Sequence, residues 1–295
     1  MNHVNVTTPA PVAYSFTKGH GTQNDFVLIP DLDGTRGLAP DQVRRLADRR
    51  AGIGGDGVIR VVPTALCGEP EIEALAGDAE WFMDYRNADG TPAEMCGNGT
   101  RVFAAYLRRE RLVTEDSYTI ATRAGIKHIG VQGAVYSTGL GQYTLTAESE
   151  FKAHGFDARV SVPGFEGLAG VSVDMGNPHT VVMLPGEVDL PAVDLSAAPV
   201  VNPLPEHGTN VELVQVIGPG QLQMRVFERG VGETRSCGTG AAAAAVAAML
   251  CSGEDGANQW RVDVPGGSLH VTVGADRQVT LSGPADLVAD GVTRL

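Results

Sequence analysis

The sequence ERGVGETRSCGTGAAAAAVAAM at residues 228–249 decides the fold of this chain. Its glycine-rich loop ends in CGTG at residues 237–240, and residues 241–249 are seven alanines, one valine and one methionine, which favour a helix. The first backbone N–H groups of a helix lack partners within it, and together with the helix dipole they favour a nearby negative charge. We therefore predict that Cys237 stands at a helix N-terminus, with a pKa below the usual value of about 8.5.

The same arrangement occurs a second time, earlier in the chain. Residues 95–107, MCGNGTRVFAAYL, again place a cysteine, Cys96, before a glycine turn and a helical pattern, and 141 positions separate it from Cys237. Asn87 precedes Cys96 by nine residues, and Glu228 precedes Cys237 by the same nine. This repeat predicts two similar halves whose helix N-termini, each with a thiol, face one another. Two thiols on opposite faces of one carbon atom are the machinery of a cofactor-independent racemase or epimerase.

Length and composition indicate a globular protein of two domains. The chain has 295 residues, 43% hydrophobic and 19% charged, which is enough for two cores of about 150 residues each. Its formal charge of −13 argues against nucleic acid or an anionic membrane surface as a partner. We expect a cytoplasmic protein, because no apolar run reaches the roughly 18 residues of a membrane span and residues 1–15 resemble a short flexible tail. The four cysteines are not spaced as zinc ligands, so no metal site is expected.

The pattern of apolar residues and glycines predicts many short strands and few helices. Residues 40–50 are typical of a helix, and residues 117–145 of short strands broken by glycines. We predict an α+β fold of two pseudo-symmetric domains, each a curled mixed or antiparallel sheet wrapped around a central helix. Residues 1–136 together with a returning tail at 284–295 form the first domain, and residues 137–283 form the second.

Two cofactor classes are disfavoured by the sequence. Residues 52–57, GIGGDG, match the glycine fingerprint of dinucleotide-binding sites, but that fingerprint needs a strand before it and a helix after it. Here a predicted helix precedes the loop and a predicted strand follows it. A pyridoxal enzyme needs a Schiff-base lysine, and none of the three lysines, Lys18, Lys127 and Lys152, has a suitable context. We therefore expect no cofactor.

Six blocks of sequence, spread over nearly the whole chain, carry a family resemblance. They are KGHGTQNDF at 18–26, MDYRNADGTPAEMCGNGTR at 83–101, DMGNPH at 174–179, HGTNVE at 207–212, MRVFERGVGETRSCGTG at 224–240 and PGGSLHV at 265–271. With these motifs in this order, the chain resembles diaminopimelate epimerase, in particular its actinobacterial branch. The resemblance implies an isomerase that converts LL-diaminopimelate to meso-diaminopimelate without pyridoxal phosphate, in lysine and cell-wall precursor biosynthesis.

The resemblance also implies roles for individual residues. Cys96 and Cys237 match the family's two acid/base thiols, and His179 and Glu228 match groups that adjust the pKa values of these thiols. The implied substrate contacts are Asn24, Asn87, Gly97, Asn98, Asn177, Asn210, Glu228, Arg229, Gly238 and Thr239. A homodimer stays an open expectation, because residues 285–295 lack the C-terminal tyrosine of the family's dimer contact.

The chain departs from the family at two further positions, and two alternatives stay open. Gly57 stands where many members carry glutamine, and Thr239 where serine is common. A proline or hydroxyproline racemase-like enzyme of the same fold would also use paired cysteines, around a pocket that accepts a ring. A thiol-redox protein would instead join Cys96 and Cys237 in a disulfide.

Overall fold

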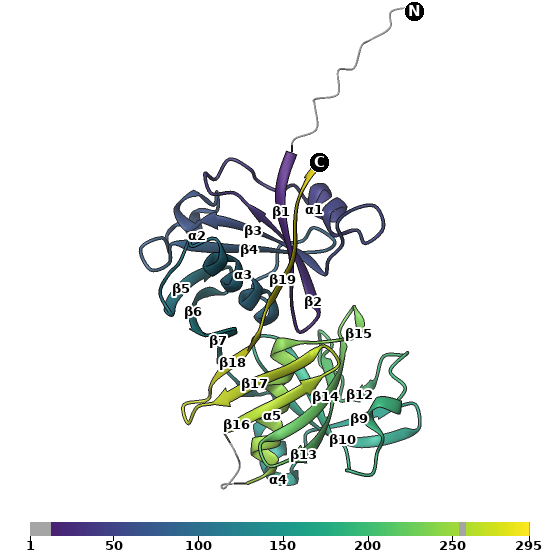
Figure 1. Ribbon diagram of the computed structural model, residues 1–295. Coiled ribbons are helices and arrows are strands. Elements are labelled where there is room, and N and C mark those ends of the chain that lie inside the picture. The colour runs from purple at the N-terminus through teal and green to yellow at the C-terminus, as the bar shows by residue number, and fades with distance from the viewer. Residues whose placement is uncertain (1–12, 254–257, 295) are drawn as a thin grey trace, which may run out of the picture.

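The computed structural model describes residues 13–253 and 258–294. The tail predicted for residues 1–15 lies outside this range, except for its last residues, which begin the first strand. Figure 1 shows two lobes, one above the other, each with a long helix packed against a curved sheet. The first and last strands run side by side in the upper lobe, where Ala13 pairs with Arg294.

The upper lobe is built mainly from the first half of the chain. Its strands are β1 (Ala13–Gly21), β2 (Asn24–Pro30), β3 (Gly57–Pro63), β4 (Trp81–Asn87), β5 (Ser117–Thr122) and β6 (Gly125–Gln132). Its helices are α1 (Pro40–Ala47), which is the helix predicted at 40–50, α2 (Pro70–Glu73) and α3 (Gly97–Arg109), with a 3-10 turn η1 (Thr64–Leu66). The last strand, β19 (Asp286–Arg294), returns from the lower lobe and pairs antiparallel with β1.

The lower lobe follows the same plan. Its strands are β8 (Thr144–Leu145), β9 (Ala158–Val162), β10 (Phe165–Asp174), β11 (Pro178–Met183), β12 (Val200–Asn202), β13 (Asn210–Gly218), β14 (Gln221–Glu228), β15 (Gly232–Thr234), β16 (Gln259–Val264), β17 (Gly267–Val273) and β18 (Gln278–Pro284). Its helices are α4 (Glu148–His154) and α5 (Gly238–Cys251), with a 3-10 turn η2 (Leu190–Ala192). The structure has two short helices, α2 and α4, that were not predicted. None of the residues of α4 is buried, so this helix has no apolar stripe that could have marked it in the sequence.

The strand pairing repeats between the lobes. In the upper lobe β2 and β3 pair in parallel, β3 and β4 pair antiparallel, and β4 leads to α3. In the lower lobe β11 and β13 pair in parallel, β13 and β14 pair antiparallel, and the chain continues through β15 to α5. Since the two lobes share this topology, the predicted pseudo-symmetric α+β fold is confirmed.

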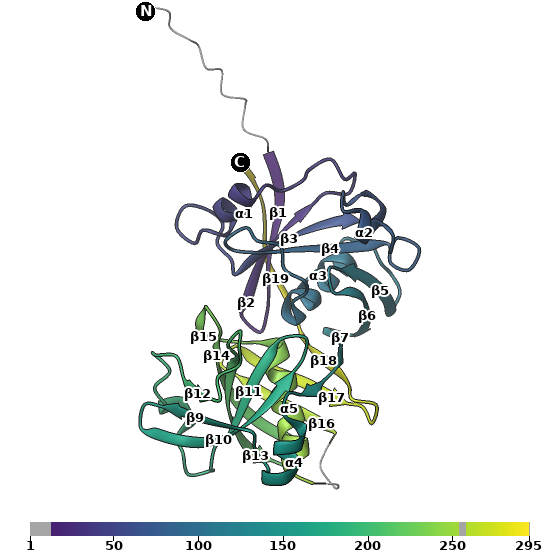
Figure 2. The same ribbon diagram turned by 180° about the vertical axis from the view of Figure 1, so that it is seen from behind.

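Each lobe encloses its long helix. Residues 241–248 of α5 are at most 1% exposed and pack against surrounding strands that include β10, β11, β13 and β17 (Figure 2). Alanine makes this possible, because its side chain adds little to the radius of the helix. In α3 the larger Phe103 and Leu107 are also fully buried, among residues of β2, β3 and β4. The two helices therefore form the centres of the two cores.

The chain crosses between the lobes twice. Strand β7 (Val135–Gln142) pairs antiparallel with β6 on one side and with β18 on the other. The return crossing runs from β18 into β19. The division at 136/137 and 283/284 therefore falls within or beside these crossing strands and stays a prediction.

Candidate active site

Two helix N-termini meet where the lobes join. Cys96 directly precedes α3 and Cys237 directly precedes α5, and each sulfur accepts a hydrogen bond of 3.4 Å from a backbone N–H of its own helix's first turn. A Cβ atom added to Gly97 would lie 3.9 Å from the Cα atom of Gly238 and 3.0 Å from Cδ2 of Leu281. The two helix starts therefore lie within van der Waals distance of one another. The predicted pair of thiol-bearing helix N-termini is therefore present.

Both thiols are free, and burial controls their ionisation. Cys237 is 8% exposed, whereas Cys96 keeps somewhat more accessible surface. Burial raises the pKa of Cys96 to about 11 and the pKa of Cys237 well above its ordinary value, and the charge of Glu228 raises both further. The N–H donors of the helices lower both pKa values, but the loss of hydration outweighs them. The prediction of a pKa below about 8.5 is therefore wrong for this conformation.

The raised pKa of Cys96 has a direct chemical test. Iodoacetamide reacts with the thiolate, whose fraction grows tenfold per pH unit below the pKa. Alkylation of Cys96 in the folded protein is expected to keep accelerating up to about pH 11, whereas in the unfolded chain it levels off near pH 8.5. Peptide mass mapping after timed alkylation follows Cys96 separately from the exposed Cys251. Equal plateaus for folded and unfolded protein would contradict the desolvation of this sulfur.

Asn24, the first residue of β2, lies against the Cys96 thiol. Its Oδ1 atom accepts hydrogen bonds from Cys96 Sγ at 3.6 Å and from Asn98 Nδ2 at 3.1 Å. Its Nδ2 atom donates to Asp56 Oδ2 at 2.7 Å, and Asp56 pairs with Arg49 at 2.8 Å. Because both ends of the amide are engaged, Asp56 fixes which atom of Asn24 faces the thiol.

Asn98, in the first turn of α3, joins the two lobes. Its Nδ2 atom also donates to the carbonyl oxygen of Ser236 at 3.2 Å, directly before Cys237. Ser236 Oγ lies 2.6 Å from the hydroxyl of Thr22 in the turn between β1 and β2. Thr239 occupies the position in α5 that Asn98 has in α3, and its hydroxyl lies 3.5 Å from Cys237 Sγ. These contacts hold the two first turns together.

A buried histidine–glutamate pair lies against the first turn of α5. His179 Nδ1 is 2.7 Å from Glu212 Oε1, and both side chains are 0% exposed. His179 Nε2 is 3.1 Å from Asn177 Oδ1. Both ring nitrogens of His179 thus have a hydrogen-bond partner, which fixes the orientation of the ring. The same Glu212 oxygen would lie 2.7 Å from a Cβ atom on Gly240, so this turn has room only for glycine.

Glu228 and Arg229 lie at the end of β14. The Thr234 hydroxyl donates to Glu228 Oε1, and burial raises the pKa of this carboxyl above its ordinary value. The backbone N–H of Arg229 donates to Asn210 Oδ1 at 2.9 Å, and its guanidinium donates to the carbonyl of His207 at 2.5 Å. The charge of Glu228 raises the pKa values of both thiols.

Asn87, the last residue of β4, is engaged within its own turn. Its Nδ2 atom donates to Thr91 Oγ1 at 3.1 Å, and its carbonyl oxygen accepts a hydrogen bond from the N–H of Gly90 at 2.9 Å. Within residues 13–253 and 258–294 its amide makes no hydrogen bond to another candidate residue. Its role as a substrate contact stays a prediction.

The structure adds three polar residues to the predicted set: Asp56, Glu212 and Ser236. Glu212 has a sequence signal, since a carboxylate between apolar neighbours in a buried strand is rare unless it is paired. Asp56 lies beside Asn24 because β2 and β3 pair in parallel, which the sequence does not reveal. Ser236 reaches the other lobe only through the docking of the two halves.

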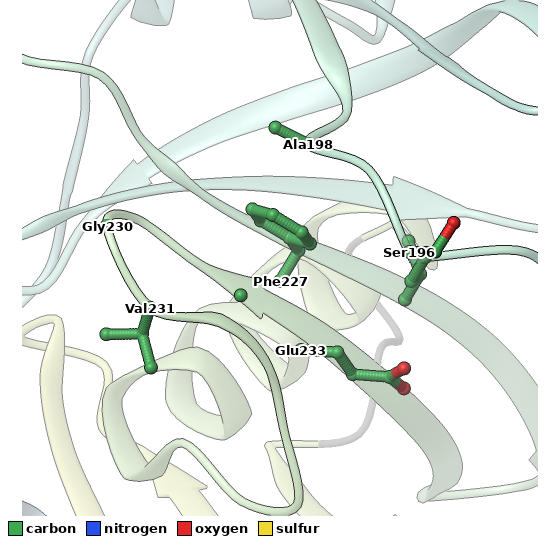
Figure 3. A pocket seen from close by; sticks show the side chains of 8 residues that line it. Ser196, Ala198, Phe227, Gly230, Val231 and Glu233 are labelled. Atoms are coloured by element: carbon green, nitrogen blue, oxygen red, sulfur yellow. The ribbon is translucent and has the colours of Figure 1, made fainter.

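A surface hollow of about 660 Å³ lies at the hairpin of β14 and β15 (Figure 3). It is lined by Leu195, Ser196, Ala198, Phe227 and residues 230–233. None of the candidate residues lines it. Successive side chains of a strand point to opposite faces, so Phe227 faces the hollow and Glu228 faces away from it. The hollow is therefore not the site formed by the thiols.

The described ranges hold neither a cluster of metal ligands nor a membrane-spanning helix. They contain no group of three or more His, Cys, Asp or Glu side chains placed to hold a metal ion. Likewise, none of the described helices is long and apolar enough to cross a membrane.

Solved structures share this fold at low sequence identity. A phenazine biosynthesis protein of Bacillus anthracis superposes with a TM-score of 0.68 at 18% identity, covering 96% of this chain and 100% of that chain. A hydroxyproline epimerase of Agrobacterium vitis superposes with a TM-score of 0.61 at 13% identity, covering 96% and 93%. At such identities the likeness concerns the fold alone.

Sequence relatives are far closer. The family model for diaminopimelate epimerase matches residues 16–144 and 171–288, in both lobes. A diaminopimelate epimerase of Streptomyces coelicolor is 48% identical over 286 residues, which cover 94% of each chain. One of Corynebacterium aurimucosum is 46% identical over 294 residues, which cover 95% of this chain and 99% of the relative. Both the resemblance and its actinobacterial character are thereby confirmed, and this chain belongs to the diaminopimelate epimerase family.

Proposed function

We propose that this protein converts LL-diaminopimelate to meso-diaminopimelate without a cofactor, with Cys96 and Cys237 as its two acid/base groups. The observation that carries the proposal is the meeting of two thiol-bearing helix N-termini, whose first turns are joined by the hydrogen bond from Asn98 to the carbonyl oxygen of Ser236. Family membership supports the substrate, since a relative that is 48% identical to this chain bears the name of this epimerase.

The two helix N-termini suit the reacting carboxylate of the substrate. Removal of the α-proton leaves a carbanion whose charge spreads into that carboxylate. Backbone N–H groups of the turns at residues 97–98 and 238–239 lie at the positive ends of α3 and α5 and have no helical partner. Preorganised donors of this kind are worth roughly 3 kcal/mol each in a site that excludes water. The turns thus stabilise the negative charge as it develops.

The two thiols exchange one proton with the substrate. One sulfur, as thiolate, removes the α-proton from one face, and the other, as thiol, delivers a proton to the opposite face. Their roles reverse in the opposite direction of turnover. A sulfur with a raised pKa is a stronger base once it is ionised, which suits the weakly acidic Cα–H bond. The ammonium group of the substrate favours that ionisation by its positive charge.

The distal end of the substrate carries a second amino group and a second carboxylate. Arg229 is suited to the carboxylate, because a guanidinium binds it through two parallel hydrogen bonds. Glu228 and the side-chain oxygens of Asn177 and Asn210 are suited to ammonium groups. The turns that contain Gly97 and Gly238 bind the carboxylate at the reacting end of the substrate. The two ends of the substrate are therefore bound by different kinds of group.

Three further expectations belong to this proposal. The enzyme acts in the cytoplasm, where amino-acid precursors are made. Its domains are residues 1–136 with 284–295 and residues 137–283, joined by the crossing strands β7 and β18. It forms a homodimer, which sedimentation in dilute solution checks directly.

Exchange of the α-proton tests the reaction. Purified, reduced protein in D₂O is expected to incorporate deuterium at Cα of LL- or meso-diaminopimelate without added cofactor, because the sulfurs exchange their protons with solvent. Mass spectrometry of the recovered substrate measures the incorporation, and heat-denatured protein is the control. Absence of exchange, together with thiol–disulfide exchange on a partner protein, would replace this proposal by the redox alternative.

The racemase alternative is less well supported. The hydroxyproline epimerase that shares the fold is only 13% identical, whereas diaminopimelate epimerases reach 48%. Offering L-proline and trans-4-hydroxy-L-proline in the same deuterium assay separates the two. We expect exchange with diaminopimelate alone.

A further inference from the structure

Arg101 is a fully buried arginine in the second turn of α3 that the proposed mechanism does not use. It is 0% exposed and is among the largest fully buried side chains of the described residues. Burial lowers the pKa of its guanidinium to about 10, so the group keeps its positive charge at neutral pH. The protein therefore holds a cation in its interior, in the helix that follows Cys96.

The hydrogen-bond partners of Arg101 are neutral oxygen atoms. Its Nε atom donates to the carbonyl oxygen of Pro284 at 3.2 Å, and its Nη2 atom donates to the Thr22 hydroxyl at 3.2 Å. Its Nη1 atom donates to the carbonyl oxygen of Gly97 at 3.4 Å. Within residues 13–253 and 258–294, no Asp or Glu side chain forms an ion pair with this guanidinium. Because a buried charge without a counter-ion is costly, these neutral contacts alone do not account for the charge.

The guanidinium is held at the junction of the two lobes. A Cβ atom added to Gly21 would lie 2.9 Å from its Nη2 atom, and one added to Gly283 would lie 3.3 Å from its Nε atom. Pro284 ends β18, where the chain returns to the upper lobe. The Thr22 hydroxyl lies 2.6 Å from the Ser236 hydroxyl of the lower lobe. The close packing and these contacts fix the position of the cation.

The contact with Gly97 connects this cation to the site. The carbonyl group of Gly97 and the N–H group of Asn98 belong to one peptide unit, so a donor on the carbonyl oxygen makes the N–H a stronger donor. This N–H belongs to the turn that the proposed mechanism assigns to the reacting carboxylate. It also lowers the pKa of the Cys96 thiol, as the N–H of Gly99 does. The guanidinium thus polarises a peptide unit whose N–H serves the reacting groups.

We propose that Arg101 is a positioning residue of this reaction, whose buried charge acts through the peptide between Gly97 and Asn98 to stabilise negative charge at the start of α3. The inference rests on the proposed function, because the carboxylate of the bound amino acid is the negative charge that balances the guanidinium. That negative charge grows as the α-proton leaves. A fixed cation therefore stabilises the transition state more than the ground state.

The test compares Arg101→Met, which removes the charge, with Arg101→Lys, which keeps it. Loss of one donor to a developing oxyanion lowers kcat by about 10²- to 10³-fold, and the weakening of such a donor costs less. We expect kcat for LL-diaminopimelate to fall by about 10- to 100-fold in Arg101→Met, with a smaller rise of KM. Arg101→Lys is expected to stay within about fivefold of the wild-type kcat, because its ammonium keeps the charge.

Alkylation of Cys96 provides a second readout, which does not depend on turnover. At about pH 9, below the pKa of this thiol, the rate with iodoacetamide follows the thiolate fraction. We expect this rate to fall by about threefold or more in Arg101→Met, because the weaker N–H donor stabilises the thiolate less. In Arg101→Lys it is expected to keep the wild-type value. Peptide mass mapping after timed alkylation measures the rate at Cys96 alone.

Arg109→Met is the matched control. Arg109 is the last residue of the same helix and pairs with Asp290 at 2.9 Å on the surface. The same substitution there is expected to leave kcat, KM and the alkylation of Cys96 unchanged. Wild-type kcat in Arg101→Met would overturn the role of the charge. Equal losses of kcat in Arg101→Met and Arg101→Lys would also overturn it, since shape and not charge would then be the cause.

Arg101→Gln repeats the neutralisation if Arg101→Met does not fold, because an amide can still donate to the same oxygen atoms. Failure of both neutral variants to fold, which melting curves reveal, would assign the charge to the docking of the lobes and overturn the proposal. Wild-type protein that neither epimerises diaminopimelate nor exchanges its α-proton would instead overturn the proposed function. The two failures are therefore distinct.

Discussion

Alanine in place of Cys96 or Cys237 is expected to stop epimerisation. In the proposed mechanism each sulfur serves one face of the substrate carbon, so neither can replace the other. A positioned acid or base contributes typically 10²- to 10⁴-fold, and we expect kcat/KM to fall by at least about 10³-fold in either variant. Coupled measurement of LL- and meso-diaminopimelate by chiral chromatography follows the loss.

The remaining sulfur should still exchange protons on its own side. Cys96→Ala in D₂O is expected to label one diastereomer at Cα slowly without inverting it, and Cys237→Ala is expected to label the other. This complementary pattern follows from the proposed mechanism, in which the two thiols approach the carbon atom from opposite sides. Exchange of the same diastereomer by both variants would contradict the two-face arrangement.

Cys251→Ala provides the control for these variants. Cys251 is the last residue of α5, is exposed, and lies at the opposite end of the helix from Cys237. Its replacement is expected to keep wild-type kcat and KM. Near-normal turnover in Cys237→Ala would show that a different group delivers the proton.

Ala244→Leu is expected to have the largest effect on stability. Ala244 is 0% exposed in the middle of α5, and the surrounding sheet touches the helix on all sides. Extra methylene groups have no free space there, and overpacking of this kind costs about 1–3 kcal/mol or more. We expect the melting temperature to fall by roughly 5–10 °C, which differential scanning calorimetry measures. Activity should fall too, since displacement of α5 moves Cys237 relative to Cys96.

Ala153→Leu separates packing from helix propensity. Ala153 lies in α4, a helix without buried residues, and its side chain is exposed. The same change of side chain there is expected to shift the melting temperature by less than about 2 °C. Equal destabilisation by both variants would mean that the enclosure of α5 is not the cause.

Local patterns predicted the two helix N-termini and the thiol at each of them. Cys96 and Cys237 were identified by their glycine turns and helical continuations, which depend on neighbouring residues alone. Asn24 is the first residue of β2 and lies beside the Cys96 thiol. The residues that could not be predicted are those whose partners lie in distant segments of the sequence. Asp56 orients Asn24 through a parallel strand pair, and Ser236 contacts Asn98 from the other lobe.

The pKa values of the thiols likewise could not be predicted from the neighbouring residues, and the predicted direction of the shift was wrong. A helix N-terminus lowers a thiol pKa, and the sequence places both cysteines at such an end. Burial depends on what the other lobe covers, and it outweighs the helix so that the pKa of Cys96 rises to about 11. Desolvation is a property of the assembled structure, whereas the helix dipole is a property of one segment.

The sequence by itself determined two repeated halves, an alanine helix thin enough to be enclosed, and a thiol at the start of each long helix. These features follow from residue type and short-range spacing. Only the tertiary structure decided that Asn24 lies beside the Cys96 thiol and how strongly burial removes both thiols from water. The physical reason is that hydrogen bonding and desolvation depend on atoms from segments distant in the chain, and their positions are set only when the lobes pack together.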